Sequence, residues 1–96
     1  MKYFHRSSVP TGDVLAHAAV FFGPRLAPAG VMPHRRSFSG SLGTLHVDVV
    51  AEGGHYTLVT ITTDQPAESE LDRLGKRFLG EVHCLAEPAH ELRGSY

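Results

Sequence analysis

The sequence predicts a two-layer α+β domain with the element order β-α-β-β-β-α, in which an antiparallel sheet carries both helices on one face. Two segments, residues 11–24 and 68–88, place apolar side chains at helical spacing. Between them, residues 35–64 change to a period of two and contain glycine turns. The length of 96 residues, with 42% hydrophobic residues, suits one small core. We therefore expect residues 1–96 to form a single α+β domain.

The N-terminal part predicts a strand followed by a helix. Residues 2–7 alternate weakly and include aromatic side chains, which indicates a first strand at an edge or beside the last strand. Thr11 is expected to cap the helix, and Gly23 and Pro24 are expected to end it. Its apolar stripe consists of Val14, Leu15, Ala18, Ala19 and Phe22. The next segment, residues 24–33, contains three of the six prolines and is expected to be a linker.

A three-stranded meander is expected between Arg35 and Asp64. Glycine supplies the positive φ of hairpin turns, so we expect two-residue turns at Leu42-Gly43 and Gly53-Gly54. The first turn sets Ser41, Ser39 and Ser37 opposite Thr44, His46 and Asp48. The second sets His46, Asp48 and Val50 opposite Ile61, Val59 and Thr57, on the face away from the helices.

The C-terminal helix shows the strongest periodicity. Its apolar face consists of Leu71, Leu74, Phe78, Val82 and Leu85, and Pro88 is expected to end it. Opposite charges four residues apart predict the exposed ion pairs Asp72–Lys76 and Arg77–Glu81. Gly75 and Gly80 lower helix propensity, which favours close packing of both against a neighbour. The predicted core is Phe38, Val47, Val49, Leu58, Leu74, Phe78 and Val82.

A glycine-turned meander that leads into a long C-terminal helix resembles a shortened helix-grip fold, that of the START and polyketide-cyclase-like superfamily. This resemblance implies an apolar ligand held between the sheet and the long helix. The segments EGGHYTLVTITTD and SELDRLGKRFLGEVH also resemble a small bacterial family to which no function is attached. Neither resemblance supplies catalytic residues.

The composition argues against several classes of partner. A formal net charge of -1, from 9 basic and 10 acidic residues, creates no field that attracts nucleic acid or an anionic membrane. The longest apolar run is far shorter than the roughly 20 residues of a membrane span. Cys84 is the single cysteine and no secretory signal is recognised, so we expect a cytoplasmic protein.

A polar face with Ser37, Ser39, His46 and Asp48 brings together the residue types of a Ser/His/Asp triad. Serines in the middle of a flat strand, whose amides belong to the sheet ladder, have no oxyanion hole. We therefore expect a polar sheet face and no catalytic residues.

Metal binding and cofactors are not expected either. His83, Cys84 and His90 offer suitable ligand atoms, but they lack the spacing of a zinc site. The glycine pair at 53–54 is not expected to bind a cofactor, because it joins two strands, whereas phosphate-binding glycine motifs join a strand to a helix.

Two functions remain open. The first is a non-enzymatic, homo-oligomeric or binding module that dimerises through Val50, Val59 and Ile61 on the outer sheet face. The alternative is a small apolar-ligand-binding or minimal catalytic protein of the helix-grip type. Its pocket would be bordered by His17, Phe22, Phe38, Tyr56, Leu74 and Phe78. A filled core favours the first function, and a cavity of several hundred Å³ between sheet and helix favours the second.

Overall fold

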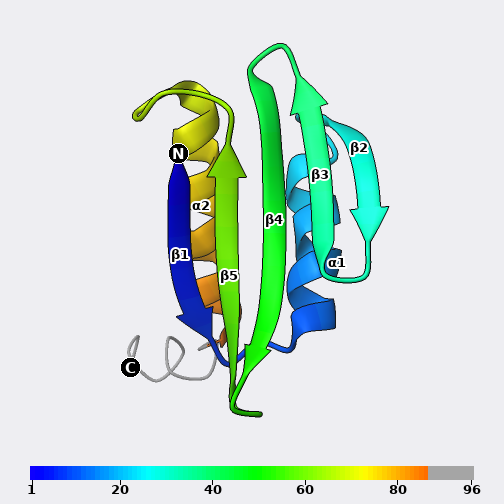
Figure 1. Cartoon of the computed structure of the whole chain (residues 1–96), viewed down its shortest axis with the longest axis vertical. Helices are drawn as coiled ribbons and strands as arrows, with labels where there is room; N and C mark the ends of the chain where they lie inside the picture. The colour runs from blue at the N-terminus through cyan, green and yellow to red at the C-terminus, as the bar shows by residue number, and fades with distance from the viewer. Residues whose placement is uncertain (87–96) are drawn as a thin grey trace, which may run out of the picture.

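A computed structural model describes residues 1–86 and confirms the α+β class. The elements are β1 (Lys2–Ser7), α1 (Thr11–Phe22), β2 (Ala27–Met32), β3 (Arg35–Gly40), β4 (Gly43–Glu52), β5 (Tyr56–Thr63) and α2 (Glu70–Ala86). The strands form one antiparallel sheet in the order β1-β5-β4-β3-β2. Both helices lie behind this sheet, α2 behind β1 and β5 and α1 behind β3 and β4 (Figure 1). The predicted end of the last helix at Pro88 lies outside the described residues.

The segment expected to be a linker contains the edge strand β2, so the strand count predicted from the sequence is one too low. β2 pairs only with β3, and its register shifts between Pro28 and Gly30. Proline has no N–H to donate, so it is tolerated in a strand mainly at a sheet edge or an irregularity. All six residues of β2 are exposed, so its sequence has no alternation of apolar and polar residues from which a strand could be predicted.

The turn between β3 and β4 lies one residue earlier than predicted, which shifts the cross-strand register by two residues. Gly40 pairs with Gly43, which leaves Ser41 and Leu42 as the turn, while Gly43 is the first residue of β4 with φ +125°. A side chain at Gly43 would collide with Asp64, whose carboxylate accepts a hydrogen bond of 2.9 Å from the Thr44 amide. A shift of two residues changes the cross-strand partners but keeps every side chain on its predicted face.

The hairpin between β4 and β5 differs by one residue, and this difference reverses the faces of β5. Glu52 pairs with Tyr56, so the loop has three residues, 53–55, with positive φ at both glycines. Val59 and Ile61 therefore point at the helices and are fully buried, while Leu58 lies on the outer face. The predicted outward orientation of Val59 and Ile61 is wrong, as is the predicted place of Leu58 in the core.

The core lies between the sheet and the two helices. Its centre is aromatic: the Phe22 ring lies 5.2 Å from that of Phe38 and 5.1 Å from that of Phe78, between ring centroids. The remaining predicted core residues Val47, Val49, Leu74 and Val82 are also buried, as is Leu71. Leu85, predicted for the same helix face, is 44% exposed.

The start of α2 is held by a capping box that the sequence analysis did not recognise. The Ser69 hydroxyl accepts the Asp72 amide at 3.1 Å, and the Asp72 carboxylate accepts the Ser69 amide at 3.2 Å. The Asp72 carboxylate also accepts the hydroxyl groups of Ser69 and Thr63, each at 2.7 Å. Asp72 is thus fully buried, and the predicted exposed pair with Lys76 is wrong; Lys76 pairs with Glu68 instead.

The two helical glycines differ in their surroundings. A Cβ atom built at Gly75 would lie 2.7 Å from Ile61 Cγ2, whereas at Gly80 no described atom would lie within 4 Å. Close packing is therefore confirmed for Gly75 and wrong for Gly80. In α1, Pro10 rather than Thr11 occupies the cap position, and its carbonyl accepts the amides of Asp13 and Val14.

Candidate functional site

The face of the sheet that points away from the helices is uncovered in the part of the chain that the structure describes (Figure 1). We call it the outer face. Alternation along the strands places on it Lys2, Phe4 and Arg6 from β1, Tyr56, Leu58, Thr60 and Thr62 from β5, His46, Asp48, Val50 and Glu52 from β4, and Arg35, Ser37 and Ser39 from β3.

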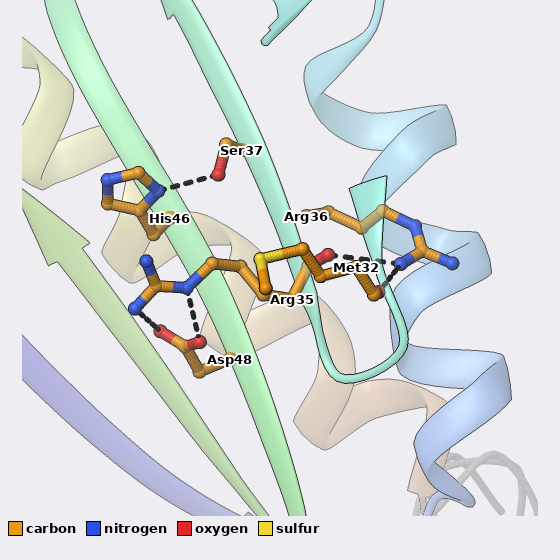
Figure 2. Close-up of polar contacts among 6 residues, drawn as sticks. All are labelled: Met32, Arg35, Arg36, Ser37, His46 and Asp48. Carbon is orange, nitrogen blue, oxygen red and sulfur yellow. Dashed lines mark hydrogen bonds and ion pairs between the residues drawn. The ribbon is translucent and has the colours of Figure 1, made fainter. Parts of the chain in front are cut away.

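The middle of the outer face is a hydrogen-bonded polar group (Figure 2). Ser37 Oγ lies 2.7 Å from His46 Nδ1, as cross-strand partners of β3 and β4. The next pair toward the β2–β3 turn is Arg35 and Asp48, joined by two hydrogen bonds of 2.7 and 3.2 Å. The hydrogen bond and the charge of Asp48 raise the pKa of Arg35.

This polar group contains the predicted residue types but not a catalytic arrangement. Ser37, Ser39, His46 and Asp48 share the outer face as predicted, but Asp48 faces Arg35 rather than Ser37. The Asp48 carboxylate accepts both of its side-chain hydrogen bonds from Arg35, so it does not orient the His46 imidazole as the acid of a triad does. The amides of β3 and β4 belong to the sheet ladder and supply no oxyanion hole. The geometry thus supports a structural role for the Ser37–His46 contact.

Arg36, the residue between Arg35 and Ser37, stabilises the turn before β3 and is not part of the polar group (Figure 2). Its guanidinium donates hydrogen bonds to the carbonyl oxygens of Met32 and Arg35, and so ties together the turn that connects β2 with β3. It does not take part in the Ser37–His46 contact.

Beside the polar group, toward the loop at residues 53–55, the outer face becomes apolar. Phe4, Val50 and Tyr56 are 61%, 55% and 58% exposed, and Leu58 lies half-buried among them. Leu58 is the cross-strand partner of both Val50 and Arg6. We call Phe4, Val50, Tyr56 and Leu58 the apolar patch. An ion pair of 2.8 Å between Arg6 and Glu52 reaches over β5 and so crosses this patch between Leu58 and Tyr56.

The six residues predicted to border a ligand pocket do not surround one space. Phe22 contacts both Phe38 and Phe78, and Leu74 is 8% exposed, so these four residues belong to the packed interior and its margin. Tyr56 lies on the outer face, on the other side of the sheet. His17 stacks on Phe78 at 5.8 Å between ring centroids and forms a 2.8 Å contact with Glu81, which replaces the predicted Arg77–Glu81 pair.

The predicted absence of a zinc site concerned His83, Cys84 and His90, and His90 lies outside the described residues. His83 packs instead against His5, with 5.8 Å between ring centroids. Desolvation and the neighbouring His83 lower the pKa of His5. Within residues 1–86, no three of the His, Cys, Asp and Glu side chains are grouped in a way that holds a metal ion.

Several residues of the outer face were not predicted from the sequence. Arg35 lies two residues before Ser37 and therefore on the same face, a relation that the alternation rule predicts once applied to it. Phe4 and Arg6 depend on β1 pairing with β5, and no local signal specifies that register.

No helix in residues 1–86 has the length and apolarity required to cross a lipid bilayer. No protein-family model matches the chain, and no curated protein matches it. The function is therefore inferred from the geometry of the outer face and of the helix side.

Proposed function

We propose that the protein is a non-enzymatic module that associates with a second copy of itself through the outer face of the sheet. The observation that carries this proposal is the apolar patch, in which three large side chains are each more than half exposed. Fully burying a side chain such as Val or Phe contributes about 1.5–3 kcal/mol. A symmetric contact would bury the patch of both copies, so the gain is counted twice.

The size of the outer face supports this proposal. Strands of six to ten residues, at about 3.3 Å per residue and 4.8 Å between strands, give a five-stranded face with a projected area of about 600 Å². The relief of the side chains makes the accessible area larger. It thus approaches the roughly 800 Å² that each partner contributes to a standard interface.

Two of the three Lys and Arg side chains on the outer face are compensated within the same copy, and the third, Lys2, lies at the start of the edge strand β1. Arg35 is neutralised by Asp48 and Arg6 by Glu52, within the same copy. A second copy would therefore meet two ion pairs whose charges are compensated within one copy, and one of these pairs crosses the apolar patch. The hydrogen-bonded centre would fix the relative position of the two sheets, because polar groups that are buried must keep their partners.

The filled aromatic interior favours this function over the alternative, an apolar-ligand-binding protein of the helix-grip type. Ring distances of 5.1 and 5.2 Å at Phe22 correspond to direct aromatic packing between sheet and helices. We also propose a cytoplasmic location, since one cysteine within these 96 residues cannot form an intrachain disulfide.

Sedimentation equilibrium tests the proposed dimer. We expect the parent protein to dimerise at micromolar concentration, and Val50→Lys to shift the equilibrium toward the monomer by about tenfold or more. Val20→Lys is the matched control, because Val20 is 71% exposed on α1, on the opposite side of the molecule. A parent protein that stays monomeric at about 100 μM, or equal effects of the two substitutions, would remove the outer face from consideration. Circular dichroism of both variants verifies that they are folded.

A further inference from the structure

A pocket of about 380 Å³ lies on the helix side of the molecule, away from the outer face. Three parts of the chain meet there: the residues after α1, the turn between β3 and β4, and the first half of α2. The pocket is lined by Arg25, Leu42, Glu70, Arg73, Leu74 and Arg77. We call it the arginine pocket, since three guanidinium groups border it and Glu70 is the one acidic side chain among its lining residues.

Arg25 is held in position before any ligand arrives. Its Nη1 donates a hydrogen bond of 2.6 Å to the Phe21 carbonyl at the end of α1, and its Cζ lies 4.6 Å from the centroid of the Phe21 ring. A guanidinium has five N–H donors, and the contact with Phe21 uses one of them. A side chain that is already ordered loses less conformational entropy on binding. Arg25 is therefore suited to receive an anion.

Arg73 and Arg77 lie one turn apart on α2, and within residues 1–86 neither side chain forms a hydrogen bond or an ion pair. Like charges at this spacing destabilise a helix. Lys76, on the same helix, has Glu68 as its partner at 3.0 Å. Two guanidinium groups thus border one pocket, and neither forms an ion pair with Glu70 or with another side chain of residues 1–86.

The pocket also has an apolar wall. Leu74 is 8% exposed, and Leu42 is partly buried against the core. A volume of about 380 Å³ falls within the range of small-molecule sites, about 300–1,000 Å³. An inorganic anion would occupy only a part of such a space and would leave the leucines uncovered.

We propose that the arginine pocket binds a small organic anion, in which a phosphate or carboxylate group is attached to an apolar group. Guanidinium groups bind both anions through paired, charge-assisted hydrogen bonds. The apolar group would lie on Leu42 and Leu74. This inference does not depend on self-association, because the two surfaces lie on opposite sides of the sheet and are tested separately.

Titrations followed by two-dimensional ¹H–¹⁵N NMR test the proposal, with the arginine Nε–H signals included. The probes are phenyl phosphate, phenylacetate, inorganic phosphate and phenol. We expect saturable shifts at Leu42, Arg73, Leu74 and Arg77 with a Kd below about 10 mM for at least one of the two aromatic anions. Inorganic phosphate and phenol are expected to bind at least about tenfold more weakly, because each lacks one half of the recognised chemistry. The tighter aromatic anion identifies the preferred acidic group.

Substitutions separate a built site from general charge attraction. Arg73→Gln and Arg77→Gln are expected to weaken binding by about tenfold or more, since each removes charge-assisted hydrogen bonds. Lys76→Gln removes the same charge from the same helix but outside the pocket, and is expected to leave the affinity unchanged. The proposal is overturned by the absence of saturable shifts below about 10 mM, by shifts at other residues only, or by an equal loss of affinity in Lys76→Gln.

Discussion

Alanine substitutions at the two glycines of α2 are expected to differ in their effect on stability, although the substitution and the helix are the same. Gly75 is buried, and a Cβ atom there would lie 2.7 Å from Ile61 Cγ2 and 3.5 Å from Leu45 Cδ1. Ile61 is itself fully buried, and Cγ2 is bonded directly to its branched Cβ. The methyl group cannot rotate away alone, so the helix or the strand β5 has to move.

The magnitude follows from two opposing contributions. Replacing glycine by alanine within a helix contributes about 1 kcal/mol of stability at either position. Overpacking a filled core costs about 1–3 kcal/mol, and this cost applies only at Gly75. Gly80→Ala is therefore expected to stabilise the protein by about 1 kcal/mol, or about 4–8 °C in Tm. Gly75→Ala is expected to be less stable than Gly80→Ala by about 1–3 kcal/mol, a difference in which the helix-propensity contribution cancels.

Urea unfolding monitored by circular dichroism measures the free energy of unfolding of the parent and both variants under one set of conditions. The slope of the free energy against urea concentration should stay the same in all three proteins, since the folded state is conserved. If the two alanine variants proved equally stable, the close contact between α2 and β5 would be refuted.

Two predictions concern ionisable groups, the buried Asp72 and the half-buried His5. Burial opposes ionisation of Asp72, but the hydrogen bonds from Ser69 and Thr63 outweigh it and lower the pKa of this carboxyl below 3.8. The ionised carboxylate therefore stabilises the fold above pH 3.8, and this stabilisation is lost as the pH falls through the folded-state pKa. Asp72→Asn should cost about 1.5–3 kcal/mol at neutral pH and weaken the acid sensitivity seen in urea titrations, and an unchanged acid profile would contradict this. The pKa of His5 is lowered by desolvation and by His83, so its neutral form is favoured by folding and stability should fall as pH decreases from about 7.5 to 5.5. His5→Phe should reduce this fall in the urea midpoint, whereas an equal fall in parent and variant would exclude His5 as a source.

The helices could be predicted well because their apolar residues repeat over several turns. In α2 the spacing of Leu71, Leu74, Phe78 and Val82 describes one face, and all four side chains are buried. A polar residue within the same helix was harder to interpret. From the sequence, Asp72 fits an exposed ion pair with Lys76 and equally fits a capping box with Ser69. Which of the two forms depends on Thr63, the last residue of β5, whose hydroxyl donates to the Asp72 carboxylate.

The strands were predicted less well because their register depends on the turns. The segment Glu52 to Tyr56 is compatible with a loop of two or three residues, since both contain the two glycines. The polar members of the candidate site kept their face because the error at the other hairpin was two residues. The apolar members changed, and Val50 alone of the three residues expected at a dimer interface lies on the outer face.

The three-residue loop at 53–55 restricts how the length of this hairpin can change, because a change by one residue would reverse the two faces of β5. Deleting either glycine would carry Leu58, Thr60 and Thr62 into the interior and expel Val59 and Ile61 into water, although no core residue had been replaced. Inserting two residues would lengthen an exposed loop at a cost of only about 0.6 kcal/mol per doubling of its length. Natural variants of this chain should therefore change the length of this loop in steps of two.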